Sequence, residues 1–329
     1  MNFMQFIINI FSTIRIKLYK YKILKSHSFN IPIISVGNIS MGGTGKTPMV
    51  GWLINELISY NIKPCIITRG YGRSDNKTIV VNKNKNYTAD QVGDEPLSII
   101  KEYPQITMVV GSNKIQSINR AIKELDIDVI IMDDGFQSLY VKRDLDIVMI
   151  NLNDQHKIIR ESMVGLDRAN VIIFKPCDES ADRANNILAH IKDNKILKMR
   201  ARSVFSFQNT NNIKDLGSVV AVCGISDSES FKNALQNNNI DVNQFLRYNN
   251  HHNYTAKDMN SIYNIMEKVS CTAMITTSKD YYKLNALNKG NKKIIVLKME
   301  LNFLETRDGQ YNTKMEFTNL LKQVIGLES

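Results

Sequence analysis

The sequence predicts an α/β protein, with a P-loop-containing, Rossmann-like parallel sheet domain followed by a second, smaller α/β domain joined by a short β-type linker. Short β-branched runs alternate with helical segments from Ile31 onward, which is typical of a parallel sheet covered by helices. A polar, Asn-rich stretch at 206–215 interrupts this alternation, and a second series begins at Val219. The 329 residues exceed the usual size of one domain. We expect an N-terminal helix at 1–28, the P-loop domain at 29–205, and the linker with the smaller domain at 206–329.

The predicted strands are short apolar runs bounded by polar or turn residues. In the first domain they are Ile33–Val36, Cys65–Thr68, Thr107–Val110, Val129–Met132, Ile147–Ile150 and Val171–Phe174, and in the second Val219–Cys223, Ala273–Thr276 and Lys293–Leu297. Helical stretches are Pro48–Tyr60, Pro96–Glu102 and Lys114–Leu125, and Ile196–Phe207 is predicted to be a strand of the link.

The composition limits the classes of binding partner but does not single one out. A formal net charge of +10 favours anionic lipid, nucleic acid or phosphorylated substrates. We expect no nucleic-acid partner, because neither aromatic–basic repeats nor zinc-finger spacing occurs. Four widely spaced cysteines without a CxxC pair indicate reduced thiols rather than a metal cluster.

The first 14 residues are largely apolar and are followed by basic residues, the reverse of the order in a signal peptide. The run is shorter than the roughly 20 residues that span a bilayer. It fits a helix lying in a membrane interface, with its apolar side formed by Phe3, Ile7, Ile10, Phe11 and Ile14 and its basic residues Arg15, Lys17, Lys20, Lys22 and Lys25 toward headgroups. A helix packed on the core, with a solvated basic end, is an equal alternative.

The strongest local signal is a Gly-rich loop between a strand and a helix. It comprises Ser40, Met41, Gly42, Gly43, Thr44, Gly45, Lys46 and Thr47, and it differs from GxxxxGK[ST] in carrying Ser40 at the first glycine position. Such a loop cradles phosphates with its backbone N–H groups, while Lys46 reaches the β/γ-phosphates and the Thr47 hydroxyl binds Mg²⁺. A strand-to-helix turn without a ligand is the alternative.

Two carboxylates, Asp133 and Asp134, end the apolar run that starts at Val129. Paired carboxylates at the end of a buried strand are costly unless a cation neutralises them, which favours a Mg²⁺ role beside the P-loop. Turn or cap aspartates before Gly135 are the alternative.

Three further polar clusters fall at expected loops. Arg69 and Arg73 follow a strand, where they suit phosphate or substrate contact or are simply solvated. Asp94 and Glu95 precede a proline, so on local grounds helix capping is favoured. The adjacent histidines at 251–252 lack other metal ligands at suitable spacing.

Taken together, the order of these motifs resembles the tetraacyldisaccharide 4'-kinase family. The matching pieces are VGNISMGGTGKTP (36–48), TRGYGR (68–73), VGDEP (92–96), DDGFQ (133–137), RDLDIV (143–148), RES (160–162), HHNYT (251–255) and SKD (278–280). The family's usual histidine after DGFQ is Ser138 here.

The resemblance implies an enzyme that uses ATP and Mg²⁺ to phosphorylate an anionic glycolipid, as a peripheral protein on the cytoplasmic side of the inner membrane. It implies that Asp94 is the general base for the sugar 4'-hydroxyl, with His251 rather than His252 as a partner that raises its basicity or orients it.

The family pattern also assigns the remaining site residues. Lys46 would be a third catalytic group. The metal would be bound by Thr47, Asp133, Asp134 and Glu161, and the substrate would be contacted by Arg69, Arg73, Gln137 and Arg160. The rival is a P-loop ATPase switch that acts on a protein partner, but such proteins usually carry a lysine where this chain has Met41. The oligomeric state stays open.

Overall fold

The computed structural model describes residues 3–40, 43–152, 159–175, 181–191, 193, 195–210, 217–225, 227–290, 292–305 and 311–327. Its strands are β1 (Ile33–Asn38), β2 (Pro64–Thr68), β3 (Ile79–Val81), β4 (Thr107–Val110), β5 (Val129–Asp133), β6 (Leu145–Asn151), β7 (Val171–Lys175), β8 (Leu197–Gln208), β9 (Val219–Cys223), β10 (Val242–Arg247), β11 (Ala273–Thr277) and β12 (Lys293–Leu304). Its helices are α1 (Phe3–Lys20), α2 (Lys46–Ser59), α3 (Ala89–Val92), α4 (Asp94–Glu102), α5 (Lys114–Glu124), the 3-10 helix η1 (Met163–Arg168), α6 (Ala181–Leu188), α7 (Ser228–Asn237), α8 (Ala256–Lys268), α9 (Ser278–Leu287) and α10 (Lys314–Val324).

One hydrogen-bonded sheet runs through the described chain in the order β10-β9-β11-β12-β8-β7-β6-β1-β5-β2-β4-β3. Its pairs are parallel except β3 with β4 and β8 with β12. The residues of β1, β2 and β9 are buried throughout, as expected for parallel strands with both faces covered. The predicted α/β class is confirmed.

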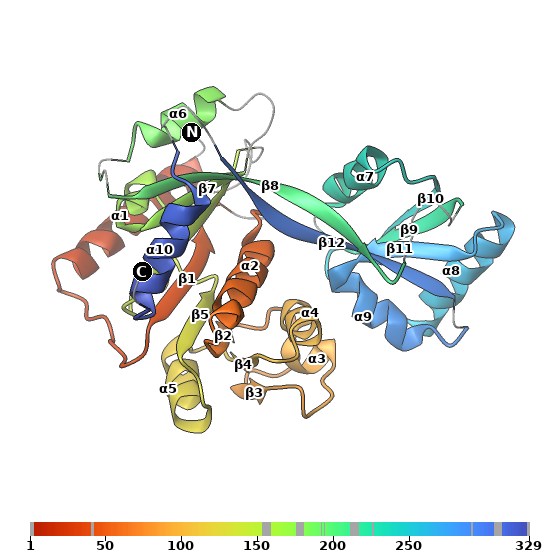
Figure 1. Ribbon diagram of the computed structural model, residues 1–329, viewed down its shortest axis with the longest axis horizontal. Helices are drawn as coiled ribbons and strands as arrows, with labels where there is room; N and C mark the ends of the chain where they lie inside the picture. The colour runs from red at the N-terminus through yellow and green to blue at the C-terminus, as the bar shows by residue number, and fades with distance from the viewer. Residues whose placement is uncertain are drawn as a thin grey trace.

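The two halves of the sheet are joined by β8 and β12, which lie side by side as a long antiparallel ribbon (Figure 1). The predicted boundary at residue 206 falls inside β8, and the part of the predicted linker at 211–216 lies outside the described residues. After the ribbon, α10 returns to the first half, where Phe317 stacks on Trp52 with ring centroids 5.1 Å apart. The last helix thus belongs to the core of the P-loop half, although it follows the predicted boundary.

Helix α1 lies against the first half and keeps one side exposed. Phe6, Ile10, Phe11 and Ile14 are 42–69% exposed, whereas the side chain of the predicted Phe3 lies outside the described residues. No helix in the described ranges combines the length and apolar character needed to cross a bilayer.

Candidate active site

The P-loop turns from β1 into α2, as the sequence predicts. Gly45 precedes the helix with φ 96°, a left-handed conformation that favours glycine, and Lys46 and Thr47 form the first turn of α2. Asn38 at the end of β1 fixes the loop, because its Nδ2 donates to the Ser40 carbonyl at 2.7 Å and to Thr44 Oγ1 at 2.9 Å. Of the remaining predicted loop residues, Gly43 is described, whereas Met41 and Gly42 lie outside the described part of the chain.

Asp133 and Asp134 lie at the same edge of the sheet, but their surroundings shift their pKa values in opposite directions. Asp134 has φ 51° and accepts two hydrogen bonds from Arg160, at 3.0 and 2.9 Å, with Lys46 Nζ 3.7 Å away. Burial alone would raise the pKa of Asp134, but these cations hold it below its ordinary value.

The neighbouring carboxylate has the opposite balance. Asp133 accepts a hydrogen bond from Thr68 Oγ1 at 3.0 Å, and among the described residues no ion pair involves it. Burial, with the negative charge of Glu95 nearby, raises the pKa of Asp133. Lys114 holds the turn by donating to the carbonyls of Asp133 and Asp134, and burial lowers its pKa to about 8. The site therefore presents one carboxylate that is paired with cations and one that forms no ion pair among the described residues.

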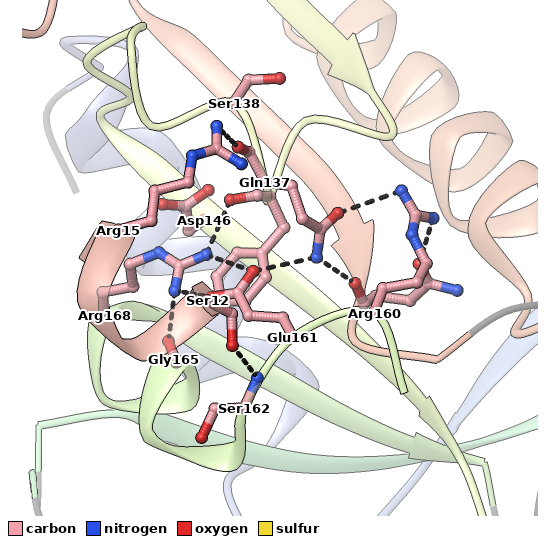
Figure 2. Close-up of polar contacts among 12 residues, drawn as sticks. Ser12, Arg15, Gln137, Ser138, Asp146, Arg160, Glu161, Ser162, Gly165 and Arg168 are labelled. Carbon is pink, nitrogen blue, oxygen red and sulfur yellow. Dashed lines mark hydrogen bonds and ion pairs between the residues drawn. The ribbon is translucent and has the colours of Figure 1, made fainter. Parts of the chain in front are cut away.

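Glu161, predicted as a metal ligand, lies within a buried polar network (Figure 2). Arg168 forms an ion pair with it, which includes a 3.0 Å bond from Nη2 to Oε2, and Gln137 Nε2 donates to the same oxygen at 3.1 Å. Arg168 also lies 3.8 Å from the centroid of the Phe136 ring. Glu161 is therefore neutralised by this chain, and within the described ranges no cluster of three His, Cys, Asp or Glu side chains could hold a metal.

Asp94 and His251 meet across the two halves of the protein. His251 Nδ1 lies 3.1 Å from Asp94 Oδ2, although 157 positions separate the two residues. Lys283 of α9, which sequence analysis missed, donates to the same oxygen at 2.8 Å. The Asp94 and Lys283 side chains are only 10% and 9% exposed, so their charges are largely shielded from water.

This triad sets the charge of Asp94. Burial favours the neutral acid, but hydrogen bonds and charge from His251 and Lys283 outweigh it, so the pKa of Asp94 lies below its ordinary value. The 3.1 Å contact suits the orienting role of the two roles expected for His251, and the role itself stays a prediction. Glu95, the next residue, forms an ion pair with Lys279 and is influenced by the charge of Lys46, which places this end of α4 beside the P-loop.

Two glycines allow the loop after β2 to lie against the start of α4. Gly70 and Gly93 have φ of 68° and 93°, and a Cβ on Gly93 would stand 2.9 Å from the Tyr71 carbonyl. Only glycine permits this approach of the two loops. It brings the Tyr71 ring to 6.1 Å from the His251 ring.

The loop that carries His251 is held from α9. Asp280, which is 1% exposed, accepts a hydrogen bond from Gly224 N at 2.9 Å, and the Gly224 carbonyl accepts one from His251 N at 3.0 Å. His251 has φ 58°, a rare conformation for a non-glycine residue that is often found at functional sites. His252 instead points to Asp258, with 3.3 Å between Nε2 and Oδ2. Of the two histidines, the structure brings His251 to Asp94.

The predicted substrate residues separate into two groups. Arg160 and Gln137 join the Asp134 network, with 3.2 Å between Arg160 Nη2 and Gln137 Oε1. Arg73 donates to the carbonyls of its own loop and of Val110, and Arg69 is exposed. Arg73 is thus a loop-fixing residue. Lys279 and Asp280 belong to the SKD motif, to which no role was assigned, and Lys283 lies one turn further along α9. Their place after the parallel strand β11 could have suggested a role in the site.

Comparison with known proteins identifies the chain. The family model described as tetraacyldisaccharide-1-P 4'-kinase matches residues 1–316. The tetraacyldisaccharide 4'-kinase of Flavobacterium psychrophilum is 34% identical over 304 residues, covering 85% of each chain. That of Desulfotalea psychrophila is 28% identical over 307 residues, covering 83% of this chain and 84% of the relative.

A solved structure supports the fold. The crystal structure of LpxK from Aquifex aeolicus, which is a complex with ATP, superposes with a TM-score of 0.75 at 23% identity and covers 98% of this chain and 97% of that one. This chain belongs to the tetraacyldisaccharide-1-P 4'-kinase family.

Proposed function

We propose that this protein transfers the γ-phosphate of ATP to the 4'-hydroxyl of tetraacyldisaccharide 1-phosphate. The observation that carries the proposal is the hydrogen-bonded Asp94–His251 pair beside the P-loop, which an ATPase switch does not need. The acceptor oxygen forms a bond to the γ-phosphorus as the bond from phosphorus to the β–γ bridging oxygen breaks. ADP leaves, and the hydroxyl proton moves to the Asp94 carboxylate.

The charge arrangement supports this role for Asp94. A base with a lowered pKa stays ionised at neutral pH, and its position is fixed by His251 and Lys283 from the other half of the protein. Lys46 and the N-terminus of α2 would bind the nucleotide phosphates.

The residues present fit Mg²⁺ as a cofactor. The carboxylate of Asp133, which is buried and forms no ion pair among the described residues, and the hydroxyl of Thr47 are oxygen donors of the kind that Mg²⁺ prefers. The ion would neutralise charge on the transferred phosphoryl group. Asp134 would hold Lys46 and Arg160 in place. Glu161 would position Gln137, and through it Arg160, rather than bind the metal directly.

We place the protein as a peripheral enzyme on the cytoplasmic face of the inner membrane, with an anionic glycolipid as substrate. Support comes from α1, whose exposed apolar residues Phe6, Ile10, Phe11 and Ile14 lie on the same helix as three basic residues, Arg15, Lys17 and Lys20. An amphipathic basic helix of this type binds anionic lipid surfaces.

The test is transfer of radiolabelled γ-phosphate to tetraacyldisaccharide 1-phosphate in detergent micelles. We expect labelled bisphosphorylated lipid, and no comparable ATP hydrolysis when the acceptor is left out. ATP hydrolysis at the same rate with and without acceptor, and no labelled lipid, would instead favour an ATPase switch.

Lys283→Met tests the surroundings of the proposed base. Because the ammonium group helps to keep the pKa of Asp94 low, its loss should raise that pKa and move the acid limb of the kcat/KM profile to higher pH. At neutral pH we expect kcat/KM to fall about tenfold, the equivalent of one charge-assisted hydrogen bond. The pH profile would be measured with the transfer assay.

The control for Lys283→Met is chosen away from the charged groups that surround Asp94. Besides His251 and Lys283 these are Glu95, with its partner Lys279, and Asp280, which lies 3.9 Å from Lys283. Lys298→Met removes another lysine that binds α4, through Glu102 at 2.8 Å, and should leave the acid limb in place. If the acid limb of the kcat/KM profile of Lys283→Met lies at the same pH as in the wild type, Lys283 does not set the charge of Asp94.

A further inference from the structure

Helix α1 presents a row of polar side chains toward the active site. Gln5, Asn9, Ser12 and Arg15 are spaced at i, i+4, i+7 and i+10, which places them on one side of a helix. We call these four residues the polar stripe of α1. The exposed apolar residues Phe6, Ile10 and Ile14 repeat on another side of the same helix.

The polar stripe binds both ends of segment 159–162. The Gln5 side chain donates to the Ile159 carbonyl at 3.1 Å and accepts from Ile159 N at 3.0 Å, so one amide satisfies both backbone groups. Ser12 Oγ accepts from Ser162 N at 3.0 Å (Figure 2). Because unpaired backbone groups are costly away from water, these contacts fix where the segment lies.

Segment 159–162 carries the arginine that neutralises Asp134. Arg160 donates to both carboxylate oxygens of Asp134 and, at 3.1 Å, to Asn38 Oδ1, the residue that fixes the P-loop. The segment also contacts the residue between β1 and the P-loop, because Arg160 N donates to the Ile39 carbonyl at 2.6 Å. A shift of this segment would therefore change the position of Asp134 relative to Lys46.

A second route runs through Gln137. Arg15 Nη2 donates to the Gln137 carbonyl at 2.8 Å, and the Gln137 side chain contacts Arg160, Glu161 and the Asn38 carbonyl (Figure 2). Both routes lead from α1 to the same arginine within a few hydrogen bonds.

We infer that the polar stripe of α1 positions Arg160 and Glu161 for phosphoryl transfer, so that α1 is part of the active site as well as the proposed lipid-binding helix. This inference rests on the proposed function. Gln5, Ser12 and Arg15 are positioning residues, because they act through segment 159–162 and Gln137. It follows that the helix affects turnover even when the substrate is dispersed and no bilayer is present.

The experiment uses two substitutions that alter neither the charge nor the exposed apolar residues of α1. In the double variant Gln5→Met/Ser12→Ala, kcat for lipid labelling in micelles should fall about tenfold, because the three hydrogen bonds from these side chains to segment 159–162 are lost. Sedimentation with phosphatidylglycerol vesicles should match the wild type. Ser12→Thr keeps the hydroxyl acceptor and should retain kcat, which separates the contact from general packing.

The matched control is Thr13→Val, which removes a hydroxyl from the next position of the same helix and should leave kcat unchanged. A double variant with wild-type kcat would overturn the inference and leave α1 as an anchor only. An equal loss of kcat in Thr13→Val would also overturn it. A wild type that labels no lipid would instead refute the proposed function itself.

Discussion

Asp94→Asn should lower kcat by about 10²- to 10⁴-fold, the range for loss of a positioned general base, while ATP affinity changes little. Asparagine keeps the shape of the side chain and can still accept hydrogen bonds from Lys283 and His251, so the contact between the two halves is retained. What it loses is the ability to take the proton of the acceptor hydroxyl. The measurement is the single-turnover rate of lipid labelling, together with nucleotide binding by calorimetry.

Two comparisons make this result specific. Asp90→Asn changes an exposed carboxylate in the preceding helix and should keep the wild-type kcat. His251→Gln should lower kcat less than Asp94→Asn, because His251 orients the base and Lys283 still holds it. A kcat within threefold of wild type in Asp94→Asn would remove Asp94 from the role of base.

The interior of the sheet could be predicted because its strands are buried on both faces. Such strands appear as continuous apolar runs, and β1, β2, β5 and β9 were found within one or two residues. The strands that sequence analysis missed lie at the two edges. β3 has three residues, and β10 mixes polar and apolar residues in VNQFLR, so neither gives a longer continuous apolar run.

Long-range pairing explains the other differences in the fold. β12 extends to Leu304 because it pairs with β8, in which Val204 faces Glu300 across about a hundred intervening residues. Local sequence cannot indicate such a partner. For the same reason the return of α10 onto Trp52 depends on the course of the ribbon, and its own amphipathic pattern does not say which core it joins.

The residues of the candidate site likewise fall into those that the local sequence suggests and those that it does not. The P-loop and Asp133–Asp134 follow strands directly, so local pattern is sufficient to suggest them. Asp94 was recognised only through the family resemblance, because on local grounds a helix cap was the better interpretation. Lys283 and Arg168 were missed because each acts through a partner: Lys283 is 189 positions from Asp94, and Arg168 acts on the buried Glu161.

Arg168→Met should lower the free energy of unfolding by about 3–5 kcal/mol, because it leaves the charge of Glu161 buried without its cation. The Glu161 side chain is 4% exposed, and Gln137 Nε2 is its remaining hydrogen-bond donor among the contacts described above. Methionine retains apolar volume against the Phe136 ring, so little of the effect should come from lost packing. Urea unfolding at neutral pH measures the change.

A double variant decides between a lost charge partner and lost packing. In Arg168→Met/Glu161→Gln no charge remains to be neutralised, so we expect much of the stability to return, whereas a packing defect would persist. A single variant within 1 kcal/mol of wild type would contradict the prediction, because a desolvated carboxylate cannot lose a two-bond arginine partner at so small a cost.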